Sequence, residues 1–103
     1  SFIMKLGIIG VNDVGLSFGL LCEKNGYEVL VSNMNEDYIF NLNQKICITN
    51  EPLIQSMLFD TKKFSATTSN TDVIKNSDII FIFSQTPSNI EGNYDTTKVF
   101  DRA

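Results

Sequence analysis

Short apolar runs alternate with segments of helical periodicity along all 103 residues of the chain. Four of the runs have the length and the β-branched composition of strands, and they lie at about 3–9, 27–32, 64–67 and 78–84. Helices are expected between and after them, at 14–25, 35–42, 52–59 and 71–76, with a final helix that begins at Asp95 or Thr96 and runs to the C-terminus. The alternation predicts an α/β layer structure with right-handed crossovers and a parallel sheet of order 3-2-1-4, as in the first part of a doubly wound domain.

The fourth strand run, at 78–84, is apolar on both faces, which is typical of the buried centre of a parallel sheet. A complete doubly wound sheet has a further strand beside this one. A chain that ends at Ala103 therefore leaves 78–84 as an exposed edge, unless the final helix covers it. Exposed apolar edges pair with other chains, so we expect self-association through this edge. The residues that follow, 87–93, are expected to form a loop.

Length and charge restrict what such a domain can do. The chain is long enough for one modest domain, residues 1–103, in which 1–3 would precede a native start at Met4. A net charge of −4 and a pI near 4.5 argue against a nucleic-acid partner. The absence of histidine excludes Ser-His-Asp and Cys-His catalysis, and no carboxylate cluster has metal-ligand spacing. No apolar run approaches the ~20 residues that span a bilayer, and two cysteines without a targeting segment fit a reducing cytoplasm.

The stretch from Gly7 to Gly15 connects the first strand with the first helix, where a dinucleotide-binding fingerprint is found. Gly10 is expected to make the tight turn after the strand, and Gly15 to let the helix pack closely on it. The free N–H groups of the helix N-terminus would then face a pyrophosphate. Asn12 replaces the middle glycine; asparagine tolerates positive φ, so the loop is expected to keep its shape while the side chain takes space that phosphate needs. The alternative is a strand-to-helix turn that binds no nucleotide.

The end of the second strand also departs from the fingerprint. An acidic residue about 20 residues after the glycines normally binds the adenine ribose, but Asn33 occupies this position. Its carboxamide can hydrogen-bond a hydroxyl without charge assistance, which weakens the contact by on the order of 1 kcal/mol. The change also removes the repulsion that excludes a 2′-phosphate, whereas Met34 provides no cation to attract one. The two asparagines therefore predict weakened or lost cofactor binding and leave the choice between NAD and NADP open.

Several motifs, in one order, resemble the N-terminal NAD-binding domain of the UDP-glucose/GDP-mannose dehydrogenase family. The resemblance covers about residues 4–100. It rests on Lys5 to Gly10 with Val14-Gly15-Leu16, Glu51-Pro52, Ala66-Thr67-Thr68, Asp78 to Ile82 with Thr86-Pro87, and Gly92 to Asp95 with Lys98-Val99. The chain departs from the family at Tyr38, where a basic residue is often found, at Lys45 and Leu53, which replace glycines, and at Gln85.

The resemblance implies a Rossmann-like domain that binds NAD, whereas a separate C-terminal domain binds the nucleotide sugar. The whole enzyme oxidises the primary alcohol of the sugar to a carboxylate in two hydride transfers. By position, the residues implied at the cofactor are Gly10, Val11, Asn12, Asp13 and Val14 at the pyrophosphate, Gly15 in the same loop, Asn33 at the adenine ribose, and Ser84, Gln85 and Thr86 at the nicotinamide-side ribose. The family's catalytic thiol, lysine and acidic groups lie beyond residue 103, so we expect no catalytic residue here and predict that this chain alone is inactive.

Two other functions are compatible with the sequence. The changes at the cofactor loops, above all Asn12 and Asn33, also fit a non-catalytic descendant that keeps the fold as a structural or interaction module. A third assignment is a relative of 6-phosphogluconate or hydroxyacid dehydrogenases, some of which carry asparagine after the second strand. An arginine usually follows it in those proteins, and Met34 argues against this assignment. Neither Cys22 nor Cys47 matches the catalytic cysteine of the resembled family.

Overall fold

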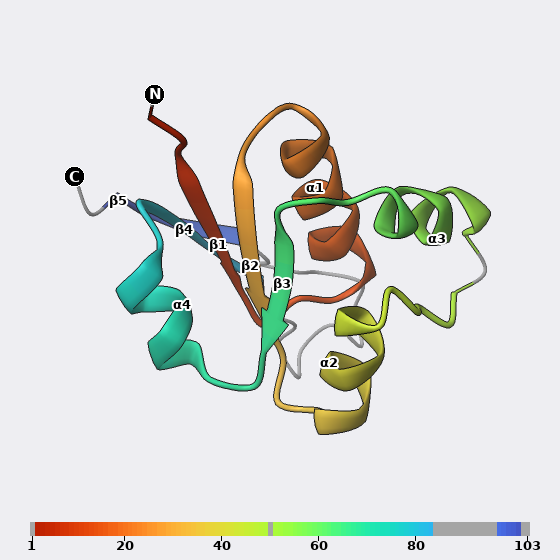
Figure 1. The fold of residues 1–103 in the computed structure, drawn as a ribbon. Coiled ribbons are helices and arrows are strands. Elements are labelled where there is room, and N and C mark those ends of the chain that lie inside the picture. Colours follow the sequence, from red (N-terminus) through yellow and green to blue (C-terminus); the bar gives the residue numbers. More distant parts are fainter. Residues whose placement is uncertain (1, 50, 84–96, 102–103) are drawn as a thin grey trace, which may run out of the picture.

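The computed structural model describes residues 2–49, 51–83 and 97–101. Its elements, shown in Figure 1, are in chain order β1 (Lys5–Ile9), α1 (Asp13–Lys24), β2 (Glu28–Ser32), α2 (Glu36–Asn43), α3 (Pro52–Phe59), β3 (Phe64–Thr67), α4 (Asn70–Asn76), β4 (Ile79–Phe83) and β5 (Thr97–Asp101). The four predicted strands and the four helices predicted between them are confirmed. Their bounds differ from the predicted ones by at most two residues. The predicted loop at 87–93 lies outside the described residues.

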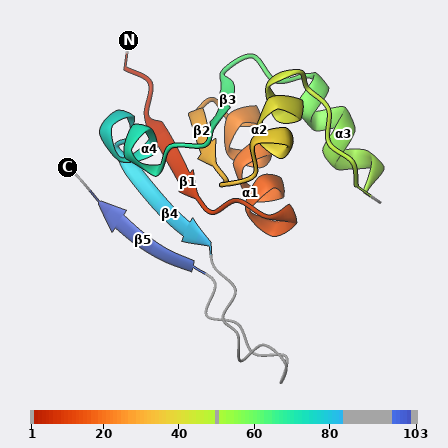
Figure 2. The same cartoon turned by 90° about the horizontal axis from the view of Figure 1, so that it is seen from below.

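The described strands form one sheet in the order β3-β2-β1-β4-β5, as seen in Figure 2. β1 lies between β2 and β4 and is parallel to both, with Gly7 opposite Leu30 on one side and Ile80 on the other. β3 pairs in parallel with the outer side of β2. The predicted order 3-2-1-4 of a Rossmann-like α/β sheet is therefore confirmed.

The predicted final helix is wrong over residues 97–101, which form β5 instead. β5 runs antiparallel to β4, with Val99 opposite Phe81. Thr97 and Val99 are β-branched residues that favour strands, and the pairing satisfies backbone groups along the apolar β4. Because β4 has a neighbouring strand on each side, the free edge expected at 78–84 is absent, and the self-association expected through it loses its basis.

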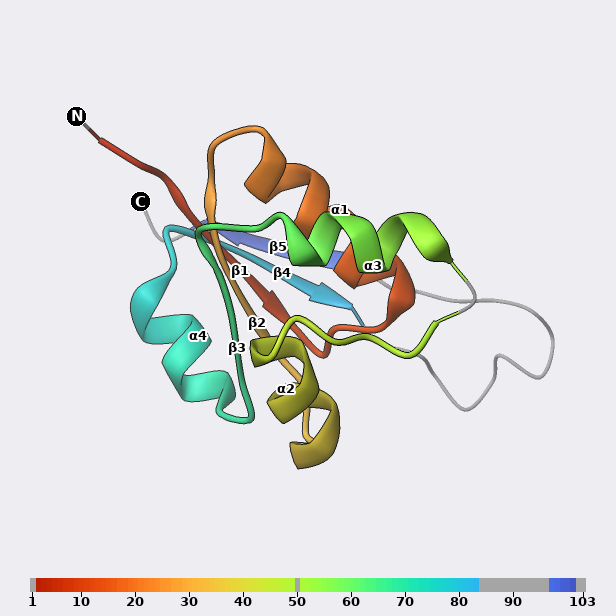
Figure 3. The ribbon, with the colours of Figure 1, turned by 45° about the vertical axis from the view of Figure 1, so that its right-hand side comes forward.

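Helices cover both faces of the sheet: α1, α2 and α3 lie on one face and α4 lies on the other. A Cβ on Gly19 of α1 would lie 2.8 Å from Ile8 Cδ1, and a Cβ on Gly7 would lie 2.5 Å from Cγ1 of Val73 in α4. Because neighbouring residues of a strand point to opposite faces, α1 and α4 cover opposite sides of β1. α2 and α3 share the side of α1, as Figures 1 and 3 show. No helix in the described part of the chain has the length and hydropathy needed to cross a membrane.

The main core lies between the sheet and the three helices α1, α2 and α3. Its buried side chains include Ile8, Val29 and Val31 from the strands, Leu16 and Leu20 from α1, Ile39 and Leu42 from α2, and Ile54 and Leu58 from α3. Full burial of each such side chain contributes about 1.5–3 kcal/mol relative to exposure. This core fixes α1 relative to the carboxyl ends of β1 and β2, where the candidate site lies.

Candidate cofactor-binding site

The chain leaves β1 through a tight turn at Gly10. The φ of Gly10 is +74°, in the left-handed region that residues with a Cβ rarely adopt. A Cβ at this position would also lie 2.6 Å from the carbonyl oxygen of Phe83, the last residue of β4. Both the conformation and the space therefore require glycine here, which confirms the tight turn predicted at Gly10.

Gly15 allows the first turn of α1 to pack against β4. A Cβ on Gly15 would lie 3.2 Å from the ring of Phe83 and 3.3 Å from Cγ2 of Val11, tighter than ordinary contact. The close packing brings the N-terminus of α1 to the carboxyl ends of β1 and β4. Open α/β sheets bind their ligands outside the carboxyl ends of the strands, where the strand order reverses.

Asn12 is the N-cap of α1 and has an extended backbone. Its φ and ψ are −124° and −170°, so the tolerance of asparagine for positive φ is not used and the loop keeps its shape for another reason. The reason is a hydrogen bond of 2.9 Å from the Gly15 amide to Asn12 Oδ1. The Asn12 carboxamide thereby satisfies one of the helix amides that a phosphate would otherwise contact.

The first turn of α1 offers two further amides. Within the described residues, the Asp13 and Val14 amides have no hydrogen-bond acceptor, whereas the Leu16 amide donates to the Asn12 carbonyl oxygen. Unpaired amides and the positive end of the helix dipole favour an anion at such a position. The carboxylate of Asp13, in the same turn, interacts favourably with the dipole and opposes a second negative charge.

Asn33 follows β2 directly, and its side chain contacts the backbone on two sides. Its Nδ2 donates a hydrogen bond of 2.8 Å to the Val11 carbonyl oxygen, and its Oδ1 accepts one of 2.8 Å from the Asn35 amide. The Asn33 backbone amide donates to the carbonyl oxygen of Thr67 at the end of β3. Asn33 therefore lies beside the β1–α1 loop, and its carboxamide joins that loop to the start of α2.

An open cleft of about 390 Å³ lies at the ends of these loops. Small-molecule sites usually measure about 300–1,000 Å³. The lining residues are Val11, Asn12, Asp13, Val14, Asn33 and Tyr38. The structure thus brings Asn33 together with the four loop residues from Val11 to Val14, although they are about 20 residues apart in the chain. Gly10 and Gly15 shape this loop without lining the cleft.

Tyr38, in the first half of α2, is the lining residue that sequence reasoning did not assign to the site. Its phenolic oxygen is buried and has no hydrogen-bond partner among the described residues. Burial, followed by the charges of Cys47 and Asp13, raises the pKa of Tyr38 above its ordinary value, so the hydroxyl stays protonated. Asn35 as a predicted cap places Tyr38 in the first turn of the helix after β2, and the packing of α2 then brings its side chain to the cleft.

The two cysteines are free thiols, Cys47 buried and Cys22 partly buried. Burial raises the pKa of both thiols, and Asp13 raises that of Cys47 further. A raised pKa lowers the fraction of reactive thiolate. Both cysteines also pack in or against the main core, which fits a packing role.

The charge of the cleft decides which groups fit it. Among the described residues that line it, Asp13 is the one side chain with a formal charge, and neither lysine nor arginine is among them. A pyrophosphate would therefore be held by the uncharged N–H donors of the helix N-terminus, those of Asp13 and Val14. On these grounds, the described residues fit a pyrophosphate at the N-terminus of α1. Ser84, Gln85 and Thr86, assigned to the other ribose, lie outside the described residues.

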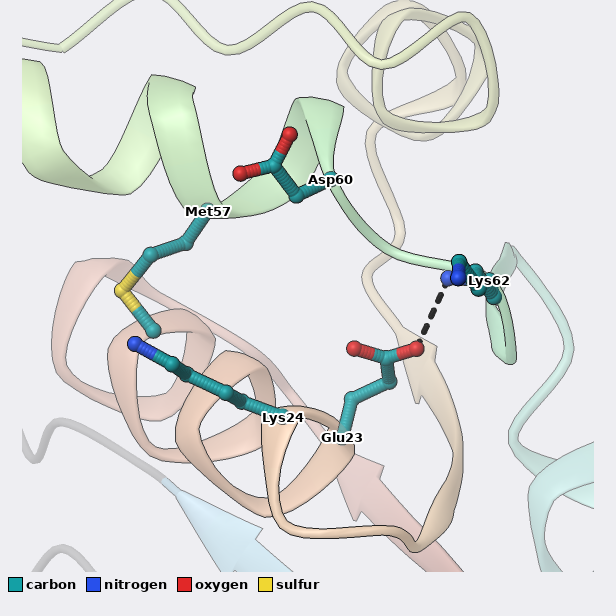
Figure 4. Close-up of a pocket in the computed structure, with 5 residues that line it drawn as sticks. All are labelled: Glu23, Lys24, Met57, Asp60 and Lys62. Carbon is teal, nitrogen blue, oxygen red and sulfur yellow. Dashed lines mark hydrogen bonds between the residues drawn. The ribbon is translucent and has the colours of Figure 1, made fainter.

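A second hollow, of about 280 Å³, lies at the opposite end of α1 (Figure 4). Its lining residues, Glu23, Lys24, Met57, Asp60 and Lys62, come from the C-terminal ends of α1 and α3 and from the segment before β3. One oxygen of the Glu23 carboxylate accepts hydrogen bonds of 2.7 and 2.9 Å from the amides of Lys62 and Lys63. This carboxylate therefore fixes the segment before β3.

The strand order, the glycine turn after β1 and the helix N-terminus at a cleft define a Rossmann-like nucleotide-binding domain. A comparison with protein-family models matches residues 4–103 to the UDP-glucose/GDP-mannose dehydrogenase family, NAD binding domain. The chain belongs to this family and corresponds to its NAD-binding domain.

Solved structures with a similar fold agree with this family. A GDP-mannose dehydrogenase from Pseudomonas aeruginosa, in a ternary complex, matches 89% of this chain with a TM-score of 0.78 and 27% identity. A UDP-D-ManNAc dehydrogenase from Pyrococcus horikoshii matches 82% with a TM-score of 0.74 and 25% identity. A UDP-glucose dehydrogenase from Pyrobaculum islandicum, 21% identical over 84% of the chain with a TM-score of 0.76, supports the fold alone. The chain spans 22%, 21% and 21% of these three proteins, respectively. A comparison with curated proteins gave no match.

Proposed function

We propose that this chain is the NAD-binding portion of a nucleotide-sugar 6-dehydrogenase of the UDP-glucose type. The observation that carries the proposal is the N-terminus of α1, whose Asp13 and Val14 amides lie at a cleft lined by residues assigned to NAD. The names of the similar structures, dehydrogenases of GDP- and UDP-linked sugars, support the substrate class. The whole enzyme would oxidise the primary alcohol of the sugar to a carboxylate.

The role of this chain in that reaction is to bind and orient the cofactor. The Asp13 and Val14 amides would hold the pyrophosphate, Asn33 would lie at the adenine ribose, and Ser84 to Thr86 at the nicotinamide-side ribose. NAD, when bound, supplies the hydride acceptor. Hydride transfer also needs a positioned sugar, so this chain alone is inactive. We place the enzyme in the cytoplasm, where the two free thiols stay reduced.

Calorimetric titration and thermal unfolding with NAD and with ADP-ribose test this proposal. We expect saturable binding of both, since the described cleft fits the half that they share. A ligand at 100 times its dissociation constant stabilises the folded state by about 2.7 kcal/mol, which thermal unfolding detects. Absence of heat and of any thermal shift at millimolar NAD, in a folded protein, contradicts the proposal.

Two glycines with positive φ provide matched variants for this titration. Gly10→Ala should abolish NAD binding, because the Cβ meets the Phe83 carbonyl oxygen and displaces the loop. Gly26→Ala introduces a Cβ at a φ of +103° with no atom within 4 Å, between α1 and β2 and away from the cleft. It should lower stability by about 1 kcal/mol and leave the NAD dissociation constant unchanged. Equal effects of the two variants on binding would argue against a site at the β1–α1 loop.

A second function, that of a non-catalytic interaction module, is favoured by one observation. The Asn12 carboxamide already satisfies the Gly15 amide, and no cation lines the cleft among the described residues, so the loop offers an anion fewer partners than the fingerprint would. This function predicts that wild-type protein does not bind NAD, whereas Asn12→Gly exposes the Gly15 amide and increases affinity. Tight binding of NAD by the wild-type protein would exclude the function of a non-catalytic interaction module.

A further inference from the structure

We propose that Asn33 is a positioning residue that sets the shape of the cofactor loop through the Val11 carbonyl oxygen, and that an aspartate at this position weakens cofactor binding. The inference rests on the proposed function, because it concerns the affinity of the same cleft. It runs against the simple expectation from the fingerprint, in which an acidic residue after β2 strengthens binding to the adenine ribose.

The hydrogen bonds of the Asn33 carboxamide fix its orientation. Nδ2 lies 2.8 Å from the Val11 carbonyl oxygen, which can only accept, and Oδ1 lies 2.8 Å from the Asn35 amide, which can only donate. A flipped carboxamide would lose both bonds. We refer to these two bonds as the Asn33 bridge.

Val11 is held at the end of β2 from both sides. Its amide donates a hydrogen bond of 2.8 Å to the Ser32 carbonyl oxygen, and its own carbonyl oxygen accepts the bond from Asn33. The Val11 side chain is only 1% exposed, so this residue cannot shift without disturbing the core. Val11 immediately precedes Asn12, the cap of α1, and the Asp13 and Val14 amides follow. The Asn33 bridge therefore fixes the position of the Asp13 and Val14 amides, which would bind a pyrophosphate.

An ionised aspartate cannot form this bridge. Its carboxylate has no hydrogen to donate, so the substitution places two acceptor oxygens, one from residue 33 and one from Val11, against each other. The carboxylate must rotate away, and the Val11 carbonyl oxygen loses its partner. The bond from the Asn35 amide can survive, because it needs only an acceptor.

The test compares Asn33→Asp with the matched control Asn35→Asp. The control adds the same charge two residues away and keeps a capping acceptor for the Tyr38 amide. We expect Asn33→Asp to raise the NAD dissociation constant about tenfold or more. We also expect a melting temperature about 5 °C lower and faster hydrogen exchange at the Val11 amide. The control should change NAD binding by no more than about twofold, the effect of surface charge.

A pH series separates positioning from general destabilisation. A protonated aspartic acid can donate to the Val11 carbonyl oxygen, so the deficit of Asn33→Asp in NAD affinity should shrink as the pH falls toward about 4. The other titratable groups among the described lining residues, Asp13 and Tyr38, are present in the wild type and in both variants, so the comparison is made at equal pH. A variant that had merely lost packing would show the same deficit at every pH.

Each outcome bears on one proposal. If wild-type protein does not bind NAD, the proposed function fails, and the melting temperature and the Val11 exchange rate still decide whether the Asn33 bridge exists. If the wild type binds NAD and Asn33→Asp binds it equally or more tightly, the positioning role is overturned. An unchanged melting temperature and exchange rate in Asn33→Asp would also overturn it.

Discussion

Lys45 has a φ of +63°, in the left-handed region, and is the one non-glycine residue with positive φ among the described residues. This conformation explains why the family resemblance leads one to expect glycine there. The Lys45 side chain compensates: its Nζ donates to the carbonyl oxygens of Phe59 and Thr61, at the C-terminal end of α3. A cation is also favourable at that end of a helix because of the dipole. Lysine in place of glycine at this position therefore strains the backbone, and the bonds from its side chain to the end of α3 offset that strain.

Substitution of Lys45 separates these two effects. Lys45→Ala keeps the strain and loses the bonds, so we expect the free energy of unfolding to fall by about 1–2 kcal/mol. Lys45→Gly also loses the bonds but relieves about 1 kcal/mol of strain, so it should lie between Lys45→Ala and the wild type. Urea unfolding followed by circular dichroism measures both. A glycine variant less stable than the alanine variant would contradict this account.

Tyr38 gives a prediction that depends on pH. Tyr38→Phe removes a buried hydroxyl without a described partner, so stability at neutral pH should rise by about 1 kcal/mol. The pKa of Tyr38 is raised in the folded state, so the unfolded chain releases the phenolic proton first, near pH 10. Wild-type stability should fall as the pH rises above about 10, and Tyr38→Phe should fall less. Tyr27→Phe, at an exposed tyrosine, is the control, and an identical alkaline loss in all three proteins would refute the prediction.

At the scale of elements, α2 protects the outer edge of β3. Asn43, the last residue of α2, donates from Nδ2 to the Ala66 carbonyl oxygen and accepts at Oδ1 from the Ala66 amide, both at 2.9 Å. A side-chain amide thus replaces the neighbouring strand that an edge strand lacks. Gln55 of α3 fixes the loop that precedes this helix in a similar way, because its side chain accepts from the Cys47 amide and donates to the Lys45 carbonyl oxygen.

Asn43→Asp tests this contact. The carboxylate can accept from the Ala66 amide but cannot donate to its carbonyl oxygen, so we expect a loss of about 1–2 kcal/mol in the free energy of unfolding. Gln44→Glu, at the C-cap of α2, makes the same charge change one residue on, at a side chain that has no hydrogen bond with any described residue. Comparison of the two in urea isolates the lost bond. A Gln44→Glu variant that is equally destabilised would assign the effect to charge.

The elements and the contacts between them differ in how far the sequence predicts them. Strand and helix positions follow from local periodicity, and Asn35 as a cap and Pro52 at a helix start follow from local chemistry. The bond from Asn33 to Val11 spans 22 residues and depends on how two loops meet. From residue type alone, Asn12 and Asn33 predicted weakened or lost cofactor binding, and the sequence did not predict the hydrogen bond that each side chain makes within the protein.

At the scale of the whole molecule, the sheet order was predictable because right-handed crossovers leave few arrangements. The strand at 97–101 was not predictable, because a five-residue segment is too short to show a clear hydrophobic period. This strand forms by pairing with β4, which is distant in the sequence. The cleft was predicted in part: the loop residues and Asn33 meet as expected, and Tyr38 was missed because its place depends on how α2 packs.

The contact between Gly10 and the Phe83 carbonyl oxygen has a practical consequence. Gly10 follows β1 and Phe83 ends β4, so the start of the β1–α1 loop lies against the end of β4. Phe83 also packs against Gly15 and is buried, with 7% exposure. A fluorine label on this ring would therefore act as a spectroscopic reporter of the loop, sensitive to occupancy of the cleft while leaving every residue that lines it unmodified.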